Sequence, residues 1–242
     1  MVKNITIDDI AWPCELSLTL KKSLLSIASF KDGITSLGGS PKHPFSSGIC
    51  YLFEGIVILS TSTLDTSATV GGVIGPQDWI GAGVMDESYR PIYTSEEVVP
   101  VVLMAFPKKL LLKLAEQDSE VFKFLFYIAQ KSLKKWTQAA ATVIHDKEMR
   151  IVFSLLELLV LHPKKDDEIP PIKISQQQLA FLSGISRPRV NEVLKALEIA
   201  EEIEITRGSL RIINLPKLAA RLNNLNVSLR DPRQFISEYQ SC

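Results

Sequence analysis

The stretch that decides the fold of the C-terminal part runs from residue 174 to 197: Ile-Ser-Gln-Gln-Gln-Leu-Ala-Phe-Leu-Ser-Gly-Ile-Ser-Arg-Pro-Arg-Val-Asn-Glu-Val-Leu-Lys-Ala-Leu. Ser175 and Gln178 have the spacing of a capping box, which predicts a helix start. Gly184 can adopt the left-handed conformation that ends a helix. Ser186 predicts the N-cap of a second helix, with Pro188 in its first turn, where a missing N–H costs little.

The second predicted helix has one apolar and one polar face. Its apolar residues recur at helical spacing and predict a buried side: Val190, Val193, Leu194 and Leu197. The opposite face carries side chains that can reach DNA: Arg187, Pro188, Arg189, Asn191, Glu192 and Lys195. Two helices around a glycine turn, with such residues near the start of the second, are typical of a helix-turn-helix.

A β-hairpin follows directly. Ile203 and Ile205 alternate with polar residues, Arg207-Gly208 is a turn signal, and 210–213 returns as a strand. A small helical domain with an ordinary hairpin is the simpler interpretation. The capped start, the glycine turn, the Ser-Arg helix start and this wing occur in order, however, and together they favour DNA binding.

These segments resemble a known family. "QQQLAFLSGISRPRVNEVLKALE" followed by "RGSLRIINLPKL" is similar to the C-terminal domain of the CRP/FNR family of bacterial transcription regulators. "YLFEGIVILS" is similar to the hairpin that opens that family's cyclic-nucleotide-binding barrel, and "IGPQDWIGAGVM" to the strand and loop leading to its phosphate-binding cassette. The resemblance implies a homodimer on double-stranded DNA, with RNA polymerase as a further partner.

The resemblance also implies how DNA is read. It puts Ser186 on a phosphate and Arg187 on guanine, with Pro188 where many relatives carry Glu. Glu192 could then accept a hydrogen bond from cytosine N4. The other residues expected to contact DNA or flank the groove are Ser175, Gln176, Arg189, Asn191, Lys195, Arg207 and Arg211.

Composition and charge fit such a protein. The 242 residues are 46% hydrophobic and 22% charged, and the net charge is zero. Residues 173–221 nevertheless hold eight Lys/Arg and five Glu, so the basic excess falls on the predicted DNA-binding domain. No apolar run approaches the length of a membrane span, and the N-terminus lacks the pattern of a signal peptide. We therefore expect a cytoplasmic protein, with Cys14, Cys50 and Cys242 as reduced thiols.

The rest of the chain predicts a β-domain followed by helices. Short β-rich runs with Gly/Pro punctuation lie between residues 49 and 106, including a hairpin that turns at Glu54-Gly55, while 31–47 has the composition of a loop. A further short helix is expected at 215–222, and the polar tail from Asn223 is expected to be partly disordered. The predicted fold class is α+β: an N-terminal jelly-roll β-barrel (1–117), a long dimerisation helix (118–145) and a C-terminal winged helix-turn-helix domain (146–242).

The long helix carries an apolar seam. Its members alternate steps of four and three residues: Phe122, Phe126, Ala129, Leu133, Trp136, Ala140 and Val143. Such a heptad pattern over three repeats favours a two-stranded coiled coil between two copies. The alternative interpretation is a helix that packs only on its own barrel.

The ligand cassette departs from the family. Cyclic-nucleotide-binding members have Gly-Glu-Leu and, about ten residues later, Arg-Ser/Thr-Ala. The matching residues here are Gly81-Ala82-Gly83 and Arg90-Pro91-Ile92. Ala82 cannot accept a hydrogen bond from the ribose, and Pro91 has no N–H for a phosphate. We expect no tight binding of cyclic AMP, and the effector is unknown.

Other cofactors and functions leave different patterns. Cys14 and Cys50 cannot supply an iron–sulfur cluster, and His43 and Cys50 are the candidate haem ligands near the barrel, each better explained as a structural or exposed residue. We predict no cofactor and no metal site. No nucleophile elbow, P-loop or metal-ligand pair suggests an enzyme, and a cupin-type enzyme would need clustered ligands. The competing hypothesis is a non-catalytic small-molecule-binding protein whose C-terminal domain mediates protein contacts.

Overall fold

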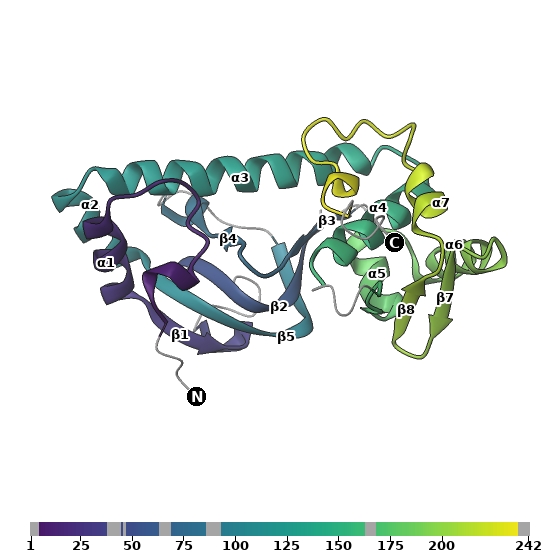
Figure 1. Cartoon of the computed structure of the whole chain (residues 1–242), viewed down its shortest axis with the longest axis horizontal. Coiled ribbons are helices and arrows are strands. Elements are labelled where there is room, and N and C mark those ends of the chain that lie inside the picture. Colours follow the sequence, from purple (N-terminus) through teal and green to yellow (C-terminus); the bar gives the residue numbers. More distant parts are fainter. Residues whose placement is uncertain are drawn as a thin grey trace. The chain divides into compact units, whose positions relative to one another are not determined.

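The computed structural model describes residues 5–37, 45, 47–62, 69–85, 93–162 and 168–236 (Figure 1). The chain divides into two compact units, residues 1–57 with 74–133 and residues 58–73 with 134–242. Strand β2 (Gly48–Ser62) and helix α3 (Glu120–Thr142) run from one unit into the other. The predicted α+β class, with an N-terminal β-domain, a long helix and a C-terminal helix-turn-helix, is confirmed. The predicted domain boundaries remain a prediction.

Five strands form the sheet of the β-domain. Their order is β1-β5-β2-β3, and β4 pairs with β2. Besides β2 they are β1 (Ser29–Asp32), β3 (Thr69–Ile74), β4 (Trp79–Ile80) and β5 (Tyr93–Pro107). β1 runs antiparallel to β5, with Ser29 opposite Ala105, and β4 antiparallel to β2, with Tyr51 opposite Trp79.

Two local predictions for this domain were wrong. The expected hairpin at Glu54-Gly55 is instead the middle of one continuous strand, β2. Gly55 has φ +90°, and a Cβ there would lie 2.3 Å from the carbonyl oxygen of Pro100, so this glycine permits a close approach of backbones rather than a turn. The expected loop at 31–47 begins with the end of β1 and a 3₁₀-helix (Ile34–Leu37) whose Ile34 and Leu37 are buried.

Helices α1 (Leu18–Ile27) and α2 (Lys108–Gln117) contact each other and strand β5. The core beneath them is rich in aromatic side chains, with Trp79 packed against Tyr51, Phe106 and Phe124. Backbone groups of Ala11 satisfy the polar atoms of this cluster: its carbonyl accepts from the Trp79 indole at 2.8 Å, and its N–H donates to the Tyr51 hydroxyl at 3.0 Å. Short 3₁₀-helices lie at Ile7–Asp9 and Ala82–Met85.

The second unit is mainly helical. It contains α4 (Lys147–Val160), α5 (Gln176–Ser183), α6 (Arg187–Ile199) and α7 (Leu215–Ala220), and α4, α5 and α6 contact one another. β6 (Ile172–Lys173), β8 (Ser209–Ile212) and β7 (Ile203–Thr206) form an antiparallel sheet in that order. The sequence predicted the β7–β8 hairpin but missed β6, because two residues are too short to show alternation.

The segment after α7 includes a 3₁₀-helix at Pro232–Gln234 that contacts α4. The buried Gln138 side chain binds this segment at two points. Its amide donates to the Asn226 carbonyl at 2.8 Å, and its carbonyl accepts from the Arg230 N–H at 3.4 Å. The tail from Asn223 was expected to be partly disordered; residues 223–236 are described and bound by the buried Gln138, and residues 237–242 lie outside the described residues.

Candidate DNA-binding interface

The helix-turn-helix forms through the predicted local interactions. The Ser175 hydroxyl accepts from the Gln178 N–H at 3.1 Å, and the Gln178 side chain accepts from the Ser175 N–H at 2.9 Å. Gly184 ends α5 in the left-handed conformation, with φ 63° and ψ 34°. Ser186 occupies the N-cap position of α6, but its side chain makes no capping hydrogen bond.

Helix α6 is anchored by its apolar face. Val190, Val193, Leu194 and Leu197 are all buried, and α6 contacts α4, α5 and β7. The opposite side is exposed at Ser186, Arg187, Pro188, Arg189, Glu192 and Lys195. Burying one face thus fixes which side chains of the recognition helix reach solvent.

A groove of about 400 Å³ lies between the start of α5, α6 and the wing. It brings together four residues that the sequence assigned to DNA: Ser175, Gln176, Arg187 and Arg207. Gln177, Thr206 and Ser209 also line it, and sequence reasoning missed them because they become neighbours only when the wing folds beside α5. Arg211 is exposed on β8, opposite Glu204 on β7.

The middle of α6 is engaged within the protein. The Gln176 amide donates to the Asn191 side chain at 3.2 Å, and Lys147 at the start of α4 forms an ion pair with Glu192 at 2.6 Å. The hydrogen bond and charge of Lys147 lower the pKa of Glu192, so this carboxylate is ionised at neutral pH. By contrast, the side chains of Arg187 and Arg189 make no hydrogen bond or ion pair within the part of the chain that the structure describes.

Two further contacts fix the frame of the domain. The Arg150 guanidinium on α4 donates to the carbonyls of Ser183 and Gly184, which form the turn of the helix-turn-helix. Glu202, which is fully buried between α6 and β7, accepts two hydrogen bonds from Arg221 after α7, each of 2.7 Å. Glu202 and Glu148 together raise the pKa of Arg221 above its usual range. A buried carboxylate needs such a partner, so this ion pair fixes the end of α6.

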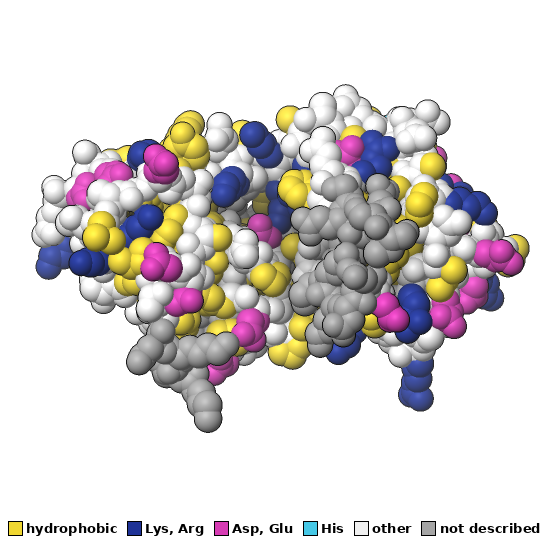
Figure 2. Space-filling view, in the orientation of Figure 1, with side chains coloured by type: hydrophobic (Ala, Val, Ile, Leu, Met, Phe, Trp, Pro, Cys, Tyr) yellow, Lys and Arg dark blue, Asp and Glu magenta, His cyan; other side chains and the backbone are white. Residues whose placement is uncertain are grey.

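The polar surface carries both signs of charge. Figure 2 shows Lys and Arg side chains along the edge formed by α6, β7 and β8, interleaved with Asp and Glu. The excess of positive charge is therefore modest, as the sequence indicated. The expectation of salt-sensitive DNA binding without a very strong non-specific component depends on this modest charge and stays a prediction.

The long helix has two different apolar faces. Val121, Phe124 and Ile128 are fully buried in the core of the β-domain. The predicted seam lies on another face: Phe122 and Phe126 are 60% exposed, Leu133 is 66% exposed, and Ala129 and Ala140 are exposed as well. Trp136 and Val143 are half-buried, and Val143 lies just beyond the end of α3.

The predicted ligand cassette is described only in part. Gly81 has φ +100°, and Ala82 and Met85 pack against the core of the β-domain. Arg90, Pro91, Ile92 and His43 lie outside the described residues. Cys50 is buried, and burial raises the pKa of its thiol to about 12, so it stays protonated at neutral pH and is a poor thiolate ligand. The described residues contain no cluster of His, Cys, Asp and Glu side chains suited to a metal, and none of their helices could cross a membrane.

Comparison with known proteins agrees with this geometry. Residues 149–221 match the Crp-like helix-turn-helix domain. The fold resembles that of a proposed CRP/FNR transcriptional regulator from Eubacterium rectale (TM-score 0.64, 12% identity, covering 97% of this chain and 100% of that one). It also resembles the c-di-GMP-responsive global regulator CLP of Xanthomonas campestris (TM-score 0.60, 18% identity, 81% and 99% covered). A CRP/FNR regulator from Thermus thermophilus is similar as well (TM-score 0.56, 19% identity, 80% and 92% covered). No curated protein matches the sequence significantly.

Residues 149–221 are therefore a Crp-like helix-turn-helix domain, which is a DNA-binding class of domain. The fold that carries this domain resembles that of CRP/FNR regulators. This match favours DNA binding over the competing hypothesis of a C-terminal domain that mediates protein contacts.

Proposed function

We propose that the protein is a homodimer that recognises a pseudo-palindromic DNA site with the first turn of α6. The observation that carries this proposal is the groove in which Arg187 and Arg207 lie beside the exposed start of α6. Arg187 donates two hydrogen bonds to guanine O6 and N7, the commonest specific contact in the major groove. Ser186 and Arg189 bind phosphates beside it.

The remaining predicted contacts take supporting roles in this proposal. Arg207 and Arg211 of the wing, together with Lys195, meet the DNA backbone. Ser175, Gln176 and Gln177 approach it from the exposed start of α5, where N–H groups favour a phosphate. Pro188 shapes the first turn of α6. Asn191 and Glu192 hold α6 in place through Gln176 and Lys147, which competes with the predicted contact of Glu192 to cytosine.

Dimerisation through α3 follows from the exposed seam. Apolar side chains as exposed as Phe122, Phe126 and Leu133, repeated along one helix face, indicate an interface when they are contiguous. A dimer about a twofold axis presents two α6 helices to successive turns of the major groove, ~34 Å apart. RNA polymerase is the further partner expected for a regulator of this type.

The ligand cassette of the β-domain argues against a cyclic nucleotide as the effector. We infer that cyclic AMP does not act on this protein, because Ala82 carries no acceptor for a ribose hydroxyl and packs against the core. Calorimetry with cyclic AMP and cyclic GMP should show no binding in the micromolar range. Micromolar affinity for either nucleotide would contradict this inference.

The experiment that tests the DNA-binding proposal is selection of random DNA by the full chain, followed by affinity measurements. We expect an enriched pseudo-palindrome with half-sites about one helical turn apart. Affinity for it should exceed that for a shuffled sequence by at least ~10³, and should fall with rising salt. Equal affinity for selected and shuffled DNA would contradict sequence-specific recognition.

A further inference from the structure

The second unit contains a small cavity beside the contacts of Arg150 described above. It is lined by Gly72 on β3, by Lys135 and Ala139 on α3, by Arg150 and Glu157 on α4, and by Arg230 of the C-terminal segment. Its volume of about 30 Å³ exceeds the roughly 10–15 Å³ that one water needs on the same measure. The cavity therefore has room for a small polar group.

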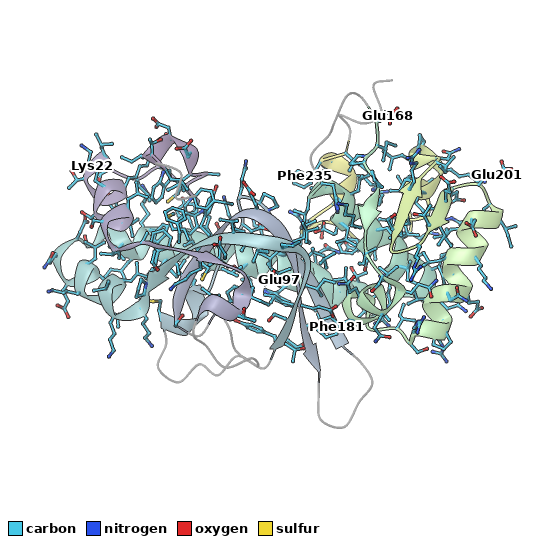
Figure 3. All side chains as sticks on the ribbon, turned by 90° about the horizontal axis from the view of Figure 1, so that it is seen from below. Lys22, Glu97, Glu168, Phe181, Glu201 and Phe235 are labelled. Atoms are coloured by element: carbon cyan, nitrogen blue, oxygen red, sulfur yellow. The ribbon has the colours of Figure 1, made fainter. Side chains whose placement is uncertain are left out.

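The arginines and the lysine of this cavity differ in how they are bound. Arg230 is paired with Glu157, since its Nε lies 2.8 Å and 2.9 Å from the two carboxylate oxygens. Its guanidinium lies 5.1 Å from the ring of Phe235, a residue of the C-terminal segment that is labelled in Figure 3. Arg150 donates to backbone carbonyls, which carry no net charge. Lys135 donates to the Val73 carbonyl at 3.0 Å and adds a further positive charge.

Arg150 shows an unsatisfied hydrogen-bonding group. Its Nε is buried and has no partner among the described residues. Burial is also what lowers the pKa of this guanidinium, with no carboxylate raising it. A buried N–H of a charged group without an acceptor is costly, so an acceptor that enters the cavity from solution would stabilise Arg150.

We propose that this cavity is a binding site for a small oxyanion, a carboxylate or phosphate group held by Arg150 and Lys135. The oxyanion accepts from Arg150 Nε and brings negative charge to this guanidinium, because Glu157 is already engaged by Arg230. Gly72, Ala139 and the aliphatic walls limit the site to a small head group.

The position of the site suggests what it controls. Arg150 also holds the carbonyls of Ser183 and Gly184, so an anion on Nε fixes the guanidinium that supports the turn between α5 and α6. Binding of the anion is therefore coupled to the orientation of the recognition helix, and by linkage to DNA affinity. This coupling rests on the proposed DNA-binding function, whereas the anion site itself does not.

The test is calorimetry of the full chain with inorganic phosphate and, separately, acetate, at constant ionic strength. Charge-assisted hydrogen bonds from Arg150 and Lys135 should give the anion a dissociation constant of roughly 1 mM, with one anion bound per chain. Lys135→Gln should weaken binding about tenfold or more, while Lys134→Gln, an exposed neighbour outside the cavity, should not. Ala139→Leu, which changes no charge, should abolish binding by filling the cavity.

Tighter binding of phosphate identifies a phosphoryl group as the natural head group, and tighter binding of acetate identifies a carboxylate. Weak binding that is equal in the wild type and the three variants would show only general attraction of anions to a basic surface, and it would refute the proposed anion site. DNA affinity at constant ionic strength tests the coupling: it should respond to the anion in the wild type but not in Lys135→Gln. An equal response in both proteins would overturn the coupling. DNA binding without anion binding would refute this inference alone, and anion binding without specific DNA binding would refute only the proposed function.

Discussion

The first and second turns of α6 use their polar side chains in different ways. In the first turn, Arg187 and Arg189 are exposed, and within the described residues their side chains form no hydrogen bond or ion pair. In the second turn, Asn191 and Glu192 are bound to Gln176 and Lys147. The comparison supports the proposal that the first turn contacts DNA, whereas the second turn holds the helix against α4 and α5.

The largest effect on specific DNA affinity is expected from a variant that disrupts the proposed dimer and so separates its two α6 helices. Phe126→Glu places a charge in the proposed α3 seam, where burial without a partner costs at least about 3 kcal/mol per dimer. We expect a monomer in sedimentation experiments and the loss of most specific DNA affinity. The first turn of α6 would be intact, but only one half-site would be read at a time.

Lys131→Glu is the matched control for Phe126→Glu, because it adds an acid to an exposed position of α3 outside the seam. It should leave the dimer intact. Because Phe126 is 60% exposed in the single chain, neither variant should unfold the protein. A Phe126→Glu protein that remains dimeric would contradict the proposed interface.

A smaller effect, on folding stability, is expected from substituting Gly184 in the turn before α6. Gly184→Ala forces a side chain into φ 63°, at a cost of about 1–2 kcal/mol of folding stability. Gly184→Asn should cost less, because Asn tolerates the left-handed region. Chemical denaturation measures both variants, and equal stability of Gly184→Ala and the wild type would show that the turn can relax.

The smallest effect is expected from releasing Glu192. Lys147→Gln removes an exposed ion pair and should change the free energy of unfolding by no more than about 1 kcal/mol. Specific DNA affinity should fall slightly, because the unpaired carboxylate faces a polyanion. A gain of preference for cytosine at one position would instead show that Glu192 can read bases once it is freed.

The local parts of the DNA-binding domain could be predicted from the sequence because each depends on neighbours along the chain. The Ser175–Gln178 capping box, the conformation of Gly184 and the apolar face of α6 all follow from residues at most a few positions apart. The pairing of Lys147 with Glu192 and of Gln138 with Asn226 could not be predicted, since these partners are 45 and 88 residues apart.

The β-domain was harder to predict for the same reason. Glu54-Gly55 is a pair typical of a turn, but Gly55 lies inside the long strand β2. There the missing side chain lets the backbone of Pro100 on β5 approach closely. The continuous strand β2 depends on a partner that is distant in sequence. The cavity around Arg150 combines residues from β3, α3, α4 and the C-terminal segment, and no motif marks it.

The most direct test of the account compares Arg187→Ala with Glu192→Gln on the selected site and on random DNA. The account predicts that Arg187→Ala costs about 1–3 kcal/mol on the selected site and relaxes the preference at one base pair of each half-site. Glu192→Gln should cost less than about 1 kcal/mol. If Arg187→Ala weakens selected and random DNA equally, or if Glu192→Gln has the larger specific effect, the assignment of base readout to the first turn of α6 is wrong.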